Sequence, residues 1–215
     1  MKHMTITHHL SDDLLMAYSA GALPEALSLV VATHVSMCPD CRAALAAHDA
    51  VGGAVLGTCG EAELAPDSLE KTLARIAATP TEAPPPKRDG SLPGPLADYV
   101  GGSLSQVKWR TLAGGVRQAV LPTDRGATAR LLYIPGGVAV PDHSHRGVEL
   151  TLVLQGAFRD ETGRFGPGDI EVASDDLEHK PVAEPGPACI CLAATEAPLR
   201  FAGLIPRLMQ PLFRI

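Results

Sequence analysis

Hydrophobic residues in the first third of the chain recur every three or four positions, the spacing of one face of an α-helix. Residues that cap or end helices, such as Ser11, Gly21 and Pro39, separate these stretches. Asp40 is the expected cap of the third helix. The predicted helices span residues 11–18, 24–38 and 41–55, and a fourth runs from Asp67 or Ser68 to about Ala78. Residues 1–79 are therefore predicted to form a small helical domain.

The pattern changes after residue 95. Short hydrophobic segments alternate there with Gly and Pro turns, which is typical of a β-barrel or a β-sandwich. The predicted strands span residues 116–121, 129–134, 147–154, 169–173, 188–194 and 199–204. Residues 80–95 between the two parts are rich in Pro and predict a semi-rigid linker without a helix. We therefore expect an α+β protein with two domains, 1–79 and 96–215.

Composition and charge narrow the range of functions. A hydrophobic content of 46% is enough for a folded core, and a net charge of −6 argues against direct binding of nucleic acid. Residues 1–78 carry nine acidic and four basic side chains, a balance of −5, which favours a partner protein with a basic surface. No segment near the N-terminus resembles a signal peptide or a membrane span, so a cytoplasmic protein is predicted.

A first metal motif lies in the helical part, where His34, Cys38 and Cys41 form an HxxxCxxC pattern. His34 and Cys38 are four residues apart and share a helical face, and Cys41 follows across a tight turn. His9 is the preferred fourth ligand, with His8 as the close alternative and His3 as a more distant one. Two thiolates and two imidazoles predict a structural Zn²⁺ site. The competing interpretation is a core histidine beside two buried thiols.

A second motif lies in the β part. His143, His145 and Glu149 share parity, so on one strand they would face a barrel interior together, and His179 would come from a strand across the barrel. Three imidazoles and one carboxylate would bind Zn²⁺ or another divalent transition metal, and the sequence alone does not choose among them. The spacing from Gly137 to Gly156 resembles the first motif of the cupins, which are small β-barrels. The alternative is a cupin that has lost its metal.

Three further cysteines and Arg130 belong to neither metal motif. Cys189 and Cys191 share one face of a predicted strand, either as a redox-reactive pair near the second metal or as small residues in the barrel wall. Cys59 is expected to be an ordinary thiol, and Arg130 is expected to be solvated. No catalytic residue is assigned.

The first motif, from His9 through His34 to Cys38 and Cys41, resembles the zinc-containing anti-sigma domain, which wraps a group IV (extracytoplasmic function, ECF) sigma factor. Together with the linker and the cupin, it resembles the ChrR type of anti-sigma factor over nearly the whole chain. The matching stretches are residues 28–34, 95–101, 147–162 and 210–215.

This resemblance implies a regulator that is not an enzyme. Its zinc domain would hold an ECF sigma factor away from RNA polymerase in a 1:1 complex, and its cupin would be needed for release on singlet oxygen or oxidative stress. The alternative is a metal-dependent cupin enzyme of the dioxygenase or isomerase type, with a helical domain that only dimerises. Turnover of a small substrate by the metal-loaded barrel would favour that alternative.

Overall fold

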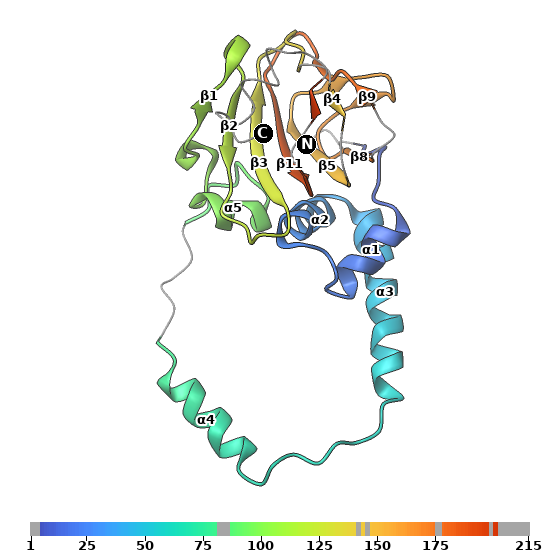
Figure 1. Ribbon diagram of the computed structural model, residues 1–215, viewed down its shortest axis with the longest axis vertical. Helices are drawn as coiled ribbons and strands as arrows, with labels where there is room; N and C mark the ends of the chain where they lie inside the picture. Colours follow the sequence, from blue (N-terminus) through green and yellow to red (C-terminus); the bar gives the residue numbers. More distant parts are fainter. Residues whose placement is uncertain are drawn as a thin grey trace.

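The computed structural model describes residues 5–80, 87–140, 143–144, 147–174, 178–197 and 200–201. A bundle of helices packs against an antiparallel β-barrel, and the second half of one long helix and a separate helix after it extend away from this body (Figure 1). The α+β class predicted from the sequence is confirmed, with a helical N-terminal region and a C-terminal sheet domain.

The helices begin and end close to the predicted positions. They are α1 (Asp12–Ser19), α2 (Glu25–Met37), α3 (Pro39–Gly57), α4 (Ser68–Ala78) and α5 (Gly94–Val100). The prediction that Asp40 caps α3 is wrong. Cys38 occupies the cap position, where its sulfur accepts the N–H of Cys41 at 3.5 Å. Pro39 lies in the first turn, where its missing N–H costs nothing, so the helix begins two residues early.

Helix α5 was not predicted, because its first residues belong to the Pro-rich segment. Pro95 lies in its first turn, a position that favours Pro. The end of the predicted linker is also held in place, because Arg88 forms a bidentate ion pair with Asp98 and Leu92 is buried in the main core. The last residues of this segment therefore dock on the body of the protein.

Twelve strands form three antiparallel sheets among the described residues. The large sheet has the order β1-β2-β3-β11-β5-β8, and the two small sheets have the orders β10-β6-β7 and β12-β4-β9. Strands β1 to β6 are Arg110–Thr111, Arg117–Val120, Thr128–Ile134, His143–Ser144, Glu149–Gln155 and Phe158–Arg159. Strands β7 to β12 are Arg164–Phe165, Ile170–Ala173, Glu178–His179, Val182–Ala183, Cys189–Thr195 and Arg200–Phe201.

The two faces of the large sheet bury different sets of side chains. On one face, Leu131 and Leu152 pair with Leu192 across the central strands, and all three join the same core as Leu27 and Val30 of α2. Alternate residues of the same strands face the barrel interior, where a separate core forms around Phe158 and Phe165. The helical region and the barrel therefore share one continuous hydrophobic core, with α2 packed on β3, β5 and β11.

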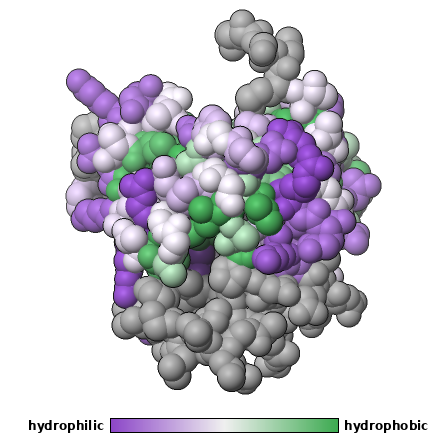
Figure 2. Space-filling view, turned by 90° about the horizontal axis from the view of Figure 1, so that it is seen from above, coloured by the Kyte–Doolittle hydropathy of each residue, from purple (hydrophilic) through white to green (hydrophobic). Residues whose placement is uncertain are grey.

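The end of α3 and all of α4 extend from this body, joined by residues 58–67 (Figure 1). Most of the exposed large hydrophobic side chains lie in or next to these helices: Val51, Val55, Leu56, Leu64, Leu69, Leu73 and Ile76. The face viewed in Figure 2 is instead mostly hydrophilic around a smaller hydrophobic area. Among the residues that the structure describes, no helix has the length and hydrophobicity needed to cross a bilayer.

Candidate metal centres

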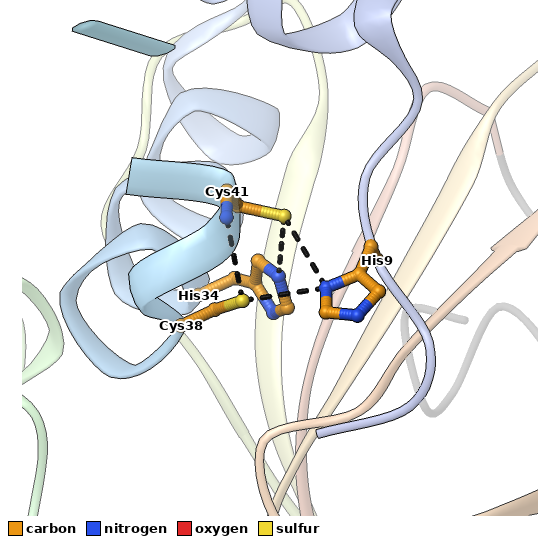
Figure 3. Close-up of side chains that lie close together, drawn as sticks. All are labelled: His9, His34, Cys38 and Cys41. Atoms are coloured by element: carbon orange, nitrogen blue, oxygen red, sulfur yellow. Dashed lines mark hydrogen bonds between the residues drawn. The ribbon is translucent and has the colours of Figure 1, made fainter. Parts of the chain in front are cut away.

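Four side chains, of which only His9 is distant in the sequence, meet beside the start of α3 (Figure 3). His34 comes from α2, Cys38 and Cys41 from the turn into α3, and His9 from the extended segment before α1. The ligand atoms of all four residues lie within 4.8 Å of one another. Of the alternatives left by the sequence, the structure brings His9 into this cluster.

The distances suit a tetrahedral ion. His34 Nε2 lies 3.2 Å from Cys41 Sγ, and His9 Nδ1 lies 3.3 Å from Cys38 Sγ and 3.7 Å from Cys41 Sγ. A tetrahedral zinc ion with bonds of about 2.3 Å to sulfur and about 2.0–2.1 Å to nitrogen separates its ligand atoms by roughly 3.5 Å. The donor set and its spacing therefore fit zinc without rearrangement, and the helical region holds a candidate metal-binding cluster.

Burial controls the protonation of His34 and Cys41. It lowers the pKa of His34 to about 4, which keeps the imidazole neutral and able to bind a metal. It also raises the pKa of Cys41 to about 11, against an opposing hydrogen bond from the backbone of Leu10. A thiol with so high a pKa stays protonated at neutral pH until a metal ion binds the sulfur and displaces its proton into solvent. Metal binding at this cluster is therefore expected to release protons and to weaken as the pH falls.

His8 and Cys59 lie outside this cluster. The ring of His8 packs on Phe165, with centroids 4.3 Å apart, and its Nδ1 lies 3.5 Å from an oxygen of Asp169. Cys59 is exposed just beyond α3. His3 lies outside the described residues.

In the barrel, the prediction that His143, His145 and Glu149 share one strand is wrong. His143 belongs to β4 of a small sheet, whereas Glu149 begins β5 of the large sheet. Gly147 lies between them with a φ of 83°, a conformation that interrupts an extended strand. The strand of His179 is also a direct neighbour rather than one across the barrel, because β9 pairs with β4 and the backbone of His179 lies opposite that of His143.

Of the four predicted barrel ligands, the structure describes the side chains of Glu149 and His179, and both are buried. The side chain of His143 and the whole of His145 lie outside the described residues. Glu149 accepts a hydrogen bond from the Thr151 hydroxyl at 3.1 Å. Its negative charge is one of the influences that raise the pKa of His179. Glu149 therefore acts electrostatically on His179 within the barrel.

His179 has two carboxylate partners that the sequence did not reveal. Its Nδ1 lies 2.8 Å from Asp160 and 3.1 Å from Glu171, and these three residues form a second cluster of metal-ligand type. Burial alone would lower the pKa of His179, but hydrogen bonds to Glu171 and Asp160 outweigh it and raise the value to about 9. Because Nδ1 is bonded to carboxylates, Nε2 is the atom through which this ring would bind a metal, as is usual for metal-bound histidines.

Comparison with known proteins gives the family. Residues 99–198 match the family model described as the ChrR cupin-like domain. The chain is 61% identical to the anti-sigma-E factor ChrR of Cereibacter sphaeroides over 213 residues, which cover 99% of this chain and 100% of that protein. The crystal structure of Rhodobacter sphaeroides SigE in complex with the anti-sigma ChrR matches with a TM-score of 0.79 and 60% identity. That match covers 89% of this chain and 99% of the solved one.

The chain belongs to the ChrR family of anti-sigma factors. This membership confirms the resemblance found in the sequence, and it agrees with a regulator rather than an enzyme. The β part of this ChrR-family chain is a cupin-like domain.

The barrel of this ChrR-family chain buries the pair Cys189 and Cys191, which does not favour reactivity. Cys189 and Cys191 face the interior with their sulfurs 3.5 Å apart, and both are essentially fully buried. The hydrogen bond to Cys189, together with burial, raises the pKa of Cys191 well above its ordinary value. Thiolates rather than thiols react with oxidants, so this environment favours the structural interpretation of the pair.

Arg130 differs from expectation, because it is 5% exposed rather than solvated. Among the residues that the structure describes, its Nε and Nη1 atoms have no hydrogen-bond partner, and burial lowers its pKa while the charge of Glu149 opposes that change. A buried cation therefore lies close enough to act on Glu149. No sequence signal marked this arginine, since its burial depends on how the strands pair.

Proposed function

We propose that this protein is an anti-sigma factor that binds an ECF sigma factor 1:1 and holds it away from RNA polymerase. The family supports this proposal: the relative of known structure was crystallised in complex with SigE, and this chain aligns with 99% of that relative. In this proposal, residues 1–79 bind the sigma factor, residues 80–95 link the domains, and residues 96–215 form the sensor. The protein acts in the cytoplasm, where its partner works.

The hydrophobic face of α4 is the single observation in the structure that best supports a protein partner. Leu69, Leu73 and Ile76 lie along one side of this helix and are 72%, 56% and 66% exposed. An amphipathic helix of this kind gains stability by burying its apolar face, and short isolated helices are only marginally stable in water. The acidic balance of residues 1–78 suits a basic surface on the sigma factor.

The proposed metal of the helical region is structural Zn²⁺, bound by His9, His34, Cys38 and Cys41. This site ties the segment before α1 to α2 and α3, so the metal would determine whether the sigma-binding helices keep their arrangement. Structural zinc in small peptides contributes roughly 10–16 kcal/mol. Loss of the metal is therefore expected to release the sigma factor.

The proposed sensor is the barrel. His143, His145, Glu149 and His179 would bind Zn²⁺ or another divalent transition metal, with the His179 ring oriented by Asp160 and Glu171. Singlet oxygen or a related oxidant would act on this domain and favour the sigma-free state. Such a shift requires that the oxidised barrel stabilises the free form more than the bound form.

Size-exclusion chromatography with a purified ECF partner tests the proposal. The wild-type chain is expected to form a 1:1 complex, and Cys38→Ser is expected to abolish it. Cys59→Ser is the matched control, because Cys59 is exposed and outside the metal cluster, and it should bind normally. A Cys38→Ser variant that folds, contains no N-terminal metal and still binds would refute the zinc-dependent mechanism.

A further inference from the structure

The fourth ligand of the N-terminal cluster is held differently from the other three. His34, Cys38 and Cys41 belong to α2, α3 and the turn between them, so local helix geometry sets their spacing. His9 lies on an extended segment on the opposite side of the cluster (Figure 3). Its position therefore depends on what that segment contacts.

On its N-terminal side, this segment is fastened to the barrel by Asp169. One oxygen of Asp169 accepts the backbone N–H groups of Thr7 at 2.6 Å and His8 at 2.9 Å, and the hydroxyl of Thr7 at 3.2 Å. The other oxygen accepts the N–H of Gly166 at 2.8 Å, which fixes the carboxylate in its own turn. Asp169 is 4% exposed, so these charge-assisted hydrogen bonds are shielded from water.

The same barrel turn contacts this segment a second time. Gly168 packs so closely on Ile6 that a Cβ atom there would lie 2.6 Å from the Ile6 side chain. The segment that leads into His9 is thus held against residues 166–169 of the barrel by both Asp169 and Gly168.

We propose that Asp169 is a positioning residue for the N-terminal metal centre. It holds residues 7 and 8 on the barrel so that His9 stays directed at the ion, and it thereby couples the metal centre to the cupin-like domain. A change in the barrel that moves this turn would weaken metal binding at the N-terminal centre, in the proposed sigma-binding region. This inference rests on the metal-binding role proposed above.

Cobalt(II) release from the full-length protein tests the inference. Thiolate ligands give cobalt(II) charge-transfer absorption, and because the predicted barrel site contains no cysteine, these bands report on the N-terminal centre alone. Asp169→Ala is expected to speed the loss of these bands to a chelator about tenfold, the lower end of the effect seen when partners of metal ligands are removed. Asp169→Asn keeps one acceptor oxygen and is expected to give an intermediate rate.

Glu184→Ala is the matched control. Glu184 is a carboxylate of the same domain, but its partners Arg159 and Arg164 lie within the barrel. This variant is expected to lose cobalt at the wild-type rate. Thermal unfolding measured in parallel separates a role in positioning the ligand from a role in stabilising the fold. If Asp169 only stabilises the fold, its substitution would lower the melting temperature without changing the rate of cobalt release.

The outcomes are distinguishable. If Asp169→Ala shows the same cobalt–thiolate bands as the wild type and releases cobalt at the same rate, the positioning role is overturned. The proposed N-terminal metal centre is not affected by that result. Equal acceleration by Glu184→Ala would overturn the positioning role as well. A wild-type chain without thiolate bands would overturn the metal centre itself, and this inference with it. If Asp169→Ala fails to fold, the cobalt release rate of Asp169→Asn is compared with that of the wild type instead. Faster release from Asp169→Asn supports the positioning role of Asp169, and an unchanged rate overturns it.

Discussion

Truncation of the exposed face of α4 is expected to weaken sigma binding without unfolding the protein. The perturbation is the triple variant Leu69→Ala, Leu73→Ala and Ile76→Ala. These side chains are 72%, 56% and 66% exposed, so they contribute little to the folded monomer. Alanine is the strongest helix former, and the helix itself should therefore persist.

The magnitude follows from the area that a partner would cover. Burying a Leu or Ile side chain completely is worth about 1.5–3 kcal/mol. Roughly two-thirds of each of these side chains is still exposed, and alanine keeps a methyl group, so each truncation should cost about 0.7–1.4 kcal/mol of binding free energy. Three truncations give about 2–4 kcal/mol, which corresponds to an increase in Kd of about 30- to 700-fold.

Isothermal titration calorimetry against the purified ECF sigma factor measures this change. A double variant on the polar side of the same helix, Glu70→Ala with Lys71→Ala, is the control and should change Kd less than threefold. Circular dichroism should show equal helix content in all three proteins. A triple variant that keeps its helix and binds within threefold of wild type would refute the assignment of α4 to the sigma interface.

Three further predictions follow from the geometry. Removal of metal by a chelator at neutral pH should lower both helix content and melting temperature, and added zinc should restore them; a chelator-resistant fold would argue against a structural ion. A thiol reagent such as DTNB should label one cysteine quickly, Cys59, and Cys59→Ser should remove that fast phase; rapid labelling of Cys191 would contradict its buried, protonated state. Glu25 accepts hydrogen bonds from Tyr99 at 2.7 Å and from the N–H of Asp124 at 2.6 Å, and these lower its pKa below the usual 4.5, so the stability that it contributes should be present at pH 6 and lost as the pH falls toward 3. Melting curves of wild type and Glu25→Gln should therefore converge on acidification, and a constant difference would rule out this linkage.

Local spacing made much of the helical region predictable from the sequence. His34, Cys38 and Cys41 are brought together by one helical turn and one tight turn, and such geometry can be calculated from residue separation alone. The choice of His9 over His8 could not be calculated in this way. It depends on which side of an extended segment faces α3 and which side faces Phe165, and this is a property of the tertiary packing.

The barrel shows why spacing alone was less informative there. His143 and Glu149 would face the same way only on one continuous strand, but Gly147 adopts a positive φ and the chain passes from one sheet to another. A Cβ atom at Gly147 would also lie within 2.5 Å of the Glu196 side chain, so the turn requires glycine. The cupin spacing from Gly137 to Gly156 therefore indicated the right fold, although His143 and Glu149 do not share a strand.

Residues whose importance comes from burial were the ones that the sequence did not reveal. Asp160, Glu171 and Asp169 look like ordinary surface carboxylates in the sequence, and Arg130 looks like an ordinary surface cation. Folding of the barrel removes all four side chains from water and sets them beside His179, Glu149 or the segment that carries His9.

Transcription in vitro is the most direct test of the anti-sigma function. RNA polymerase with the purified ECF sigma factor would be titrated with the full-length chain on a promoter that depends on this sigma factor. Transcription should fall to background near one equivalent of the zinc-loaded chain, whereas a chain stripped of its metal before the assay should leave transcription undiminished. Undiminished transcription with the zinc-loaded chain in excess would contradict the account.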